Sequence, residues 1–427
     1  MNPTPHRRPF FGWSVVGGTM GLQGLQALLF AQAYGIYVVA LTSELGWSRT
    51  AVASGYALVQ LLGGLMGPAQ GWLLERYGPR RVAAVGVALF GAGLILASGV
   101  TTLSAFTAAM ALTGVGVALS GFLTATTAIV PWFRRRRATA LSYMSVGMSL
   151  GGLLVPIVAA SVVAFGWRPT LAGSGVAMLL LGLPAAALLR RDPERYGQEV
   201  DGGPGGLPDP ARGGATWRAD GPATDFTLRD ALRTRAFWAL GMGHGAALLV
   251  VAAVVVHLVP HLESGVGLSL QAASAVVAAV TATTAISQVV GGALGDRYPK
   301  RRIAQLAMFA HAGALLALAW VPGWLGIGLF VLLHGWGWGS RGPLMGAMRA
   351  DYFGAAHFGS IMGASSLVIM GGQLAGPVIA GALADLLGDY RWGFTILAGL
   401  AAVGSLAFVL ATPPRPRPAS TAPAAEG

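Results

Sequence analysis

The 427-residue chain contains no cysteine and few charged residues. The absence of cysteine excludes disulfides and iron–sulfur clusters held by thiolates. Only 10% of the residues are Asp, Glu, Lys or Arg, against about 25% in soluble domains. Hydrophobic residues make up 54% of the chain, and the mean hydropathy is +0.64. This composition predicts an integral membrane protein.

Patterns typical of enzymes are also missing. The sequence has no Walker phosphate-binding loop and no pair of acids inside an apolar run, so ATP-driven transport and intramembrane hydrolysis lack their residues. His257 and His261 are one helical turn apart, but no further acid or cysteine completes a metal site near them. We therefore expect a protein without enzymatic activity, cofactor or metal.

Two long runs contain no charged residue, residues 82–133 and 303–340. Each is long enough for more than one membrane span, because about 20 apolar residues cross the hydrocarbon. Such unbroken runs do not fit a β-barrel, whose short strands alternate in polarity. Division at glycine, proline and polar residues predicts an all-α polytopic membrane protein with twelve transmembrane helices in two six-helix repeats. The expected spans are 12–40, 50–74, 82–100, 103–131, 138–164, 169–189, 236–260, 269–295, 303–321, 323–348, 357–384 and 391–411.

The cations gather on one side of this topology. If the N-terminus is cytoplasmic, most of the 28 lysines and arginines lie inside, only Arg49, Arg168 and Arg391 lie outside, and Arg341 falls within a span. This bias predicts that both termini are cytoplasmic. It also accounts for the net charge of +12 without nucleic acid, because the arginines are distributed one loop at a time beside helix ends. The expected partners are the lipid bilayer and a small solute, and the expected state is a monomer.

The chain divides near its middle. We expect an N-terminal six-helix bundle over residues 1–189, a cytoplasmic linker over 190–235, a C-terminal six-helix bundle over 236–411 and a disordered tail over 412–427. The linker contains GGPGGLPDPARGG and is expected to be mostly flexible. Its end, TDFTLRDALRTRAFW, predicts a short surface helix in which Thr227 and Asp230 have the spacing of a capping pair.

The two halves repeat each other. GWLLERYGPRR, residues 71–81, returns as GALGDRYPKRR, residues 292–302, at a shift of 221. A second pair aligns Phe133 with Phe353 at a shift of 220. Because each half has an even number of expected spans, both halves keep the same orientation, which makes this a parallel repeat.

At these residues the chain resembles the major facilitator superfamily, whose signature is a Gly-x-Leu-x-Asp-Arg-x-Gly-x-Arg-Arg motif between helices 2 and 3, repeated between helices 8 and 9. An acid there can lie at the positive N-terminus of a neighbouring helix and pair with arginine. The resemblance implies that the contact helps to close the inner gate. The residues that carry it are Gly71, Glu75, Arg76, Arg80, Gly292, Asp296, Arg297 and Arg301. Glu75 replaces the usual Asp, and Pro299 stands near a usual Gly.

A narrower resemblance concerns the segments PFFGWSVV, at the start of helix 1, and WFRRRRATALSYMSVGMSLGG, leading into helix 5. They are similar to signatures of the monocarboxylate porter and oxalate/formate exchanger branch. ELGWSRTAVASGYAL fits the bacterial members of that group, which implies a bacterial inner (plasma) membrane. These segments indicate a branch and do not identify a substrate.

The expected substrate site lies on polar and aromatic faces of several spans. Arg341 is the only formally charged residue expected in the interior of a span, and His334 and Trp338 share its helix face. Arg341 could bind a carboxylate, mark the helix end or pair with Asp351. The other substrate-binding candidates are Gln26, Phe30, Tyr34, Gln60 and Gln288. Their alternative role is interhelical bonding that holds the bundle together.

His244 and His257 are the candidates for carrying a proton, since histidine titrates near neutrality. The branch commonly places acids or bases inside helices 1, 8 or 11, and this chain has none there. The predicted function is secondary transport of a small, monocarboxylate-like organic anion by alternating access. The alternatives are a multidrug or hydrophobic-metabolite exporter and a non-transporting sensor or scaffold.

Overall fold

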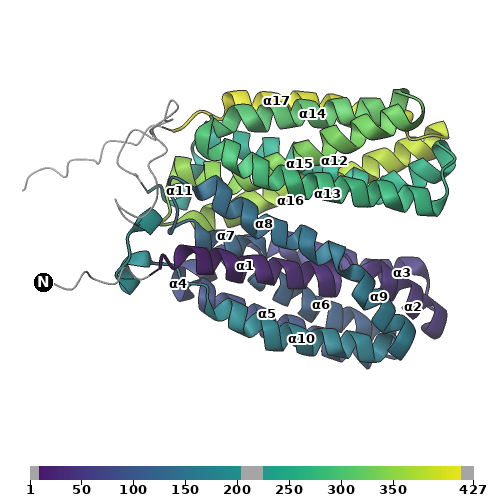
Figure 1. Ribbon diagram of the computed structural model, residues 1–427, viewed down its shortest axis with the longest axis horizontal. Coiled ribbons are helices and arrows are strands. Elements are labelled where there is room, and N and C mark those ends of the chain that lie inside the picture. Colours follow the sequence, from purple (N-terminus) through teal and green to yellow (C-terminus); the bar gives the residue numbers. More distant parts are fainter. Residues whose placement is uncertain (1–8, 203–224, 415–427) are drawn as a thin grey trace, which may run out of the picture.

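The structure is a computed structural model that describes residues 9–202 and 225–414. The described residues form two helical bundles that lie side by side, one from each half of the sequence (Figure 1). The described ends of the chain and of the linker lie together at one end of the bundles, which we call the linker end. The opposite end is called the far end.

The N-terminal bundle contains all six expected spans, but four of them are interrupted. The spans predicted at 12–40, 103–131 and 138–164 are each present as a single span with a local interruption, whereas the span predicted at 50–74 is broken into two helices. The bend between the two segments of the second span is 57°. Pro68 and Pro156 each stand in the first turn of a second segment, where proline cannot donate the backbone hydrogen bond that would continue the preceding helix. The segments are α1 (Gly12–Gln26), a π-helix (Ala27–Ala31), α2 (Tyr34–Leu45), α3 (Arg49–Leu65), α4 (Gly67–Tyr77), α5 (Pro79–Ser98), α6 (Leu103–Ser120), α7 (Phe122–Ile129), α8 (Arg137–Leu153), α9 (Val155–Phe165) and α10 (Trp167–Ala187).

The C-terminal bundle contains the other six spans with fewer interruptions. They are α12 (Arg235–Pro260), which continues into a π-helix (His261–Gly265), α13 (Leu270–Arg297), α14 (Lys300–Trp320), α15 (Gly323–Phe353), α16 (Phe358–Leu387) and α17 (Arg391–Leu410). The main difference from the prediction is that α15 continues past 348 to Phe353. Arg349, expected in a cytoplasmic loop, therefore lies inside a helix.

By length and composition, ten helices among the described residues could cross a membrane, or eleven if α3 and α4 count as one bent span. The helix α15 is long enough, with 31 residues, but is not among them. Its glycines, tryptophans and histidine and Arg341 lower its hydropathy. A span of this composition belongs beside protein or a cavity rather than lipid, because polar groups in contact with hydrocarbon are costly.

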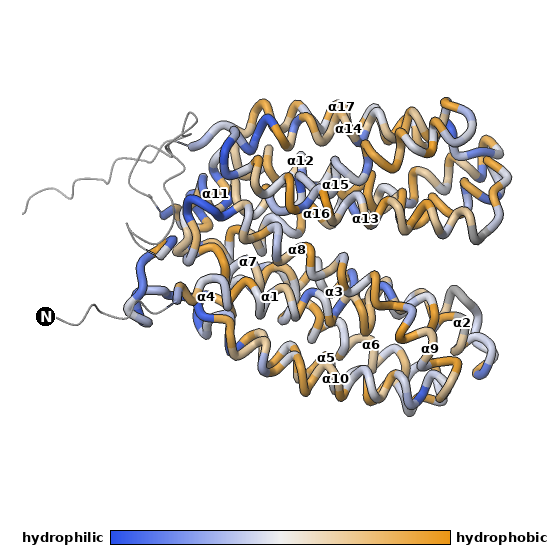
Figure 2. The backbone as a smooth tube through the Cα atoms, in the orientation of Figure 1, coloured by the Kyte–Doolittle hydropathy of each residue, from blue (hydrophilic) through white to orange (hydrophobic). Residues whose placement is uncertain are grey.

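Hydrophobic residues line both bundles along their length, and hydrophilic residues gather at the linker end (Figure 2). Large apolar side chains are exposed on the outside of the bundles, for example Val163 at 89% and Leu386 at 79%. An apolar surface of this extent suits contact with lipid chains.

The described parts of the linker are folded against the bundles. Short 3₁₀-helices span Pro193–Tyr196 and Val200–Gly202, and α11 spans Leu228–Leu232. The predicted capping of α11 is present, because the Thr227 side chain accepts a hydrogen bond from the Asp230 N–H at 3.2 Å. Residues 203–224 and most of the predicted disordered tail lie outside the described residues.

Candidate functional site

The acids of the repeated motif each bind the first turn of a helix in the other half. Asp296 accepts hydrogen bonds from the backbone N–H groups of Ala138, at 2.8 Å, and Thr139, at 3.0 Å, at the start of α8. Glu75 accepts one from the N–H of Ser360, at 2.9 Å, at the start of α16. Thr139 and Ser360 are 221 positions apart, as are Glu75 and Asp296. The two contacts are thus one contact made twice, and each is worth roughly 0.3–2 kcal/mol from the helix dipole.

The motif arginines have other neighbours in this arrangement. Arg76 lies over the rings of Trp72 and Tyr77, 5.7 Å from each centroid. Arg301 donates to the carbonyl of Val409 at 3.4 Å. Arg80 and Arg297 are exposed. Among the described residues no ion pair joins these arginines to Glu75 or Asp296, so the expected acid–arginine pairing is absent. Within the described parts of the chain, His357 is the only ionisable side chain paired with Glu75, at 3.6 Å.

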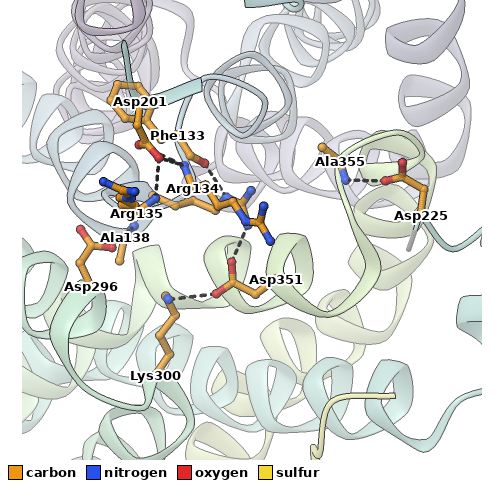
Figure 3. Close-up of polar contacts among 11 residues, drawn as sticks. Phe133, Arg134, Arg135, Ala138, Asp201, Asp225, Asp296, Lys300, Asp351 and Ala355 are labelled. Atoms are coloured by element: carbon orange, nitrogen blue, oxygen red, sulfur yellow. Dashed lines mark hydrogen bonds and ion pairs between the residues drawn. The ribbon is translucent and has the colours of Figure 1, made fainter. Parts of the chain in front are cut away.

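Other residues form a further ion pair between the halves (Figure 3). Asp351 of α15 pairs with Arg137 of α8 and with Lys300 of α14, the latter at 2.9 Å. Arg137 also donates to the carbonyl of Phe133 at 2.9 Å. Because both cations are bound to Asp351, the alternative in which Arg341 pairs with Asp351 is wrong.

Glycines allow the halves to approach backbone to backbone at the linker end. A Cβ atom on Gly71 would lie 2.4 Å from the carbonyl oxygen of Gly359, and one on Gly363 would lie 2.1 Å from that of Gly67. Gly292 faces α8 in the same way, with Ser142 Oγ 2.3 Å from its would-be Cβ. The motif glycines therefore fit a contact in which α4 meets α16 and α13 meets α8.

Arg341 lies inside the C-terminal bundle, with 1% of its surface exposed. Its Nε and Nη1 atoms have no hydrogen-bond partner among the described residues. His334 lies on the same helix and is fully buried, and its ring is 6.0 Å from that of the half-buried Trp338. A buried guanidinium without an acceptor loses its water without compensation, at a cost of several kcal/mol.

The candidates of the N-terminal half are bonded mainly within that half. Gln26 donates to Ser120 Oγ at 2.8 Å, and the Tyr34 hydroxyl donates to the Val52 carbonyl at 2.6 Å. The Phe30 ring lies 5.2 Å from that of Tyr34 in an edge-to-face contact. The structure thus gathers Phe30 and Tyr34 in an aromatic cluster, and it joins no residue of this group to Arg341 by a hydrogen bond within the described parts.

Two further candidates, Gln288 and Gln60, differ in burial. Gln288 of α13 is buried, and its side-chain oxygen accepts a hydrogen bond from Ser149 of α8 at 3.4 Å, so it joins the two halves. Gln60 of α3 is exposed. One apolar groove of about 530 Å³ lies beside α5 and α6. A second, of about 370 Å³, lies among α1, α8 and α10. None of the substrate-binding candidates lines either groove.

The candidates for proton transfer have different surroundings. His244 of α12 is buried, with an Nδ1 atom that lacks a partner among the described residues. His257 is partly exposed, and its Nε2 lies 2.9 Å from the carbonyl oxygen of Pro377. In the described parts of the chain no three His, Asp or Glu residues are grouped as metal ligands would be.

Two buried residues of the C-terminal half were missed from the sequence. Arg349 is 1% exposed and donates to Ser365 Oγ at 2.7 Å and to the Leu240 carbonyl at 3.3 Å, which ties α15 to α16 and α12. His311 of α14 lies against His334. The length of α15 would have revealed Arg349, whereas His311 is a single polar residue in an apolar run and gives no signal alone.

Comparison with known proteins decides the family. The model of the Major Facilitator Superfamily matches residues 20–332 and 241–427. The chain belongs to the major facilitator superfamily. Monocarboxylate transporter 11 of Mus musculus is 30% identical over 433 residues, covering 96% of this chain and 90% of that protein. This relative confirms the predicted monocarboxylate branch.

Two further similarities concern the fold and a shorter segment. The structure of the fucose:proton symporter of E. coli superposes with a TM-score of 0.68 at 14% identity, covering 93% of this chain and 98% of that one. It confirms the predicted fold of two repeats. The fujikurins efflux protein of Gibberella fujikuroi is 32% identical over 131 residues, which is 30% of this chain and 28% of that protein.

Proposed function

We propose that this superfamily member is a secondary active transporter that moves a small organic anion, of monocarboxylate type, by alternating access. The observation that carries the proposal is the guanidinium of Arg341, which is buried and has two nitrogen atoms without a partner among the described residues. A planar guanidinium binds a carboxylate through two parallel hydrogen bonds. Of the other buried arginines, Arg137 is paired with Asp351 and Arg349 already donates to neutral acceptors, so Arg341 has the greater capacity to bind an anion.

The contacts between the halves support alternating access. Hydrogen bonds and ion pairs join the halves at the linker end, through Asp296, Glu75 and Asp351. Each is a weak contact of a few kcal/mol at most, so a modest gain in binding energy can open them. If the cations mark the cytoplasmic side, this arrangement is closed to the cytoplasm. The gating role of the motif residues remains part of this proposal.

Uptake into proteoliposomes tests the anion site. We expect saturable uptake of labelled lactate or pyruvate by the wild type, its loss in Arg341→Ala and partial retention in Arg341→Lys, which keeps the charge. Arg233→Ala, which removes an exposed arginine of the linker, serves as the control and should transport normally. Uptake that is unchanged by Arg341→Ala would exclude this residue as the anion site.

Efflux of hydrophobic metabolites is the second candidate. It is supported by the fungal efflux protein among the relatives and by the aromatic cluster, in which the Phe30 and Tyr56 rings are stacked 5.9 Å apart. Resistance to apolar toxic compounds on overexpression, without monocarboxylate uptake, would favour this function. Absence of both activities would favour a sensor or scaffold.

Membrane location is proposed on the same grounds. The protein is an integral membrane protein, as its family is, with both termini proposed to be cytoplasmic. The mouse and fungal relatives do not support the predicted bacterial inner membrane, which stays a prediction.

A further inference from the structure

Two histidines on neighbouring helices face each other inside the C-terminal bundle. His311 of α14 and His334 of α15 are both fully buried, and their Nδ1 atoms are 3.2 Å apart. The Nε2 atom of each ring is also buried and has no hydrogen-bond partner among the described residues. The pair therefore has one internal hydrogen bond and two unused nitrogens.

Counting protons shows what this geometry can bind. Two neutral imidazoles carry two protons. One lies between the two Nδ1 atoms, so the ring that donates it has a bare Nε2, and the ring that accepts it carries its own proton on Nε2. A third proton can bind the bare Nε2 without breaking the bond between the rings. The pair then carries one positive charge and keeps its geometry.

The packing fixes the two rings in this position. Gly337 allows the close approach, because a Cβ atom there would lie 3.3 Å from two carbons of the His311 ring and 2.9 Å from the carbonyl oxygen of Ala307. Phe330 stacks on the His334 ring with centroids 5.2 Å apart, and Trp338 meets the same ring edge-on. The pair is thus closed to solvent in this arrangement. A site that carries a proton across a membrane must be closed to both sides at one stage of the transport cycle.

The charged and titratable groups around the pair come from the helices packed on α14 and α15. Arg341 and Arg349 lie on α15 itself, and His244 lies on α12. The acidic and basic residues of α13 and α17 lie at the ends of those helices, and so do the lysine and arginines of α14. Arg137 lies at the start of α8, and Asp351 lies near the end of α15. The nearby formal charges are therefore cations, and among the described residues no acid lies beside the histidines.

We propose that the His311–His334 pair is the proton-binding site that couples transport to a proton gradient, a proposal that rests on anion binding at Arg341. With Arg341 free of anion, its positive charge opposes protonation of the pair. A carboxylate bound at Arg341 cancels that charge, so one anion and one proton bind together. The loaded carrier then moves both across the membrane with no net charge, which makes the protein a symporter.

Proteoliposomes separate coupling from transport. His311→Asn and His334→Asn place an amide near the former Nδ1, which can hydrogen-bond to the remaining histidine but cannot titrate. His261→Gln is the matched control, since this buried histidine lies 3.3 Å from the carbonyl oxygen of Leu318, which a glutamine amide can also reach. Each protein is assayed with labelled lactate and pyruvate for counterflow exchange and for accumulation driven by an inward proton gradient. Protein-free liposomes correct for diffusion of the neutral acids.

The expected result is that the wild type and His261→Gln accumulate the anion about tenfold per pH unit, as one proton per anion requires. The two Asn variants should lose accumulation yet keep counterflow, which also shows that they are folded. As a second measurement, lactate added to purified wild type in weak buffer should cause uptake of about one proton per anion bound, and the Asn variants should take up none.

Two outcomes would overturn the proposed proton site and leave the proposed anion transport intact. One is gradient-driven accumulation in both Asn variants at the wild-type level, and the other is counterflow by the wild type without any accumulation. Absence of counterflow in the wild type for both probes would overturn the anion-transport function as well, so the two failures are distinguishable.

Discussion

Asp201 and Asp225, which flank the undescribed part of the linker, bind equivalent turns in the two halves (Figure 3). Asp201 accepts hydrogen bonds from the N–H groups of Arg134, at 3.2 Å, and Arg135, at 2.9 Å. Asp225 accepts them from residues 355 and 356, at 3.0 and 3.1 Å. The two turns are 221 positions apart, the same shift that relates the gating acids.

This relationship attaches the linker to the parts of the protein that meet at the linker end. Arg137 lies two residues after the first turn, and its ion-pair partner Asp351 lies four residues before the second. Backbone bonds strengthen both attachments, since Asp201 N–H donates to the Trp132 carbonyl and Phe226 N–H donates to that of Phe353, each at 3.0 Å. The linker ends therefore move with the two halves.

Removal of either linker acid should loosen only the turn that it binds. In Asp201→Ala and Asp225→Ala, two turn N–H groups lose an anionic acceptor, which should destabilise the turn locally by about 1 kcal/mol. Amide hydrogen exchange should then be about fivefold faster at 134–135 in the first variant and at 355–356 in the second. Glu199→Ala, an exposed acid two residues before Asp201, is the control. Equal exchange rates in all three variants would show that the contacts do not hold the turns.

Neutralising a gating acid should open the linker end. In Asp296→Asn, the charge at the α8 N-terminus is lost, and the closed state should be disfavoured by roughly 0.3–2 kcal/mol, or about 2- to 30-fold. Spin labels on cysteines that replace Tyr77 and Tyr298 report the distance between the halves, and the chain has no native cysteine to interfere. The short-distance population should fall, and Asp385→Asn, at the far end, should leave it unchanged. A closed population that survives Asp296→Asn would remove this acid from the gate.

Most of the fold was predictable because the apolar runs are long and the repeat is visible in the sequence. The interruptions were missed because they depend on packing. The π-helix at residues 27–31 leaves no signature in residue type, and the bend at Met66 requires both Pro68 and the close approach of α4 to α16. The extension of α15 was missed because Arg349 and Asp351 read as loop residues, while their actual partners come from other helices.

The candidate site was less predictable, since its contacts join residues far apart in the sequence. The shift of 221 indicated that Glu75 and Asp296 are equivalent, but not that each binds a helix of the opposite half. Spacing along one helix grouped His334 with Arg341. It could not reveal His311, because a partner on another helix is fixed only by the packing of α14 on α15.

The two buried arginines of α15 should respond oppositely to substitution. Arg349→Met should lower the free energy of unfolding by about 1–3 kcal/mol, because Ser365 Oγ and the Leu240 carbonyl lose their charged donor. Arg341→Met should leave it unchanged or raise it, because the change removes a buried charge that has unsatisfied donors. Thermal unfolding in detergent compares the two variants. Equal destabilisation would mean that Arg341 is held by structural contacts in solution.

Gly71 provides the sharpest test of the close approach between the halves. In Gly71→Ala, the new methyl group would lie 2.4 Å from the Gly359 carbonyl oxygen, and backbone cannot move aside as a side chain can. Overpacking of this kind costs about 1–3 kcal/mol, and here only the closed linker end bears it. The spin-label distance between positions 77 and 298 should therefore lengthen, whereas Gly63→Ala, with no atom within 4 Å of the new Cβ, should leave it as in the wild type. An unchanged distance in Gly71→Ala would show that α4 and α16 do not meet this closely in the membrane, and the closed state would need a different contact.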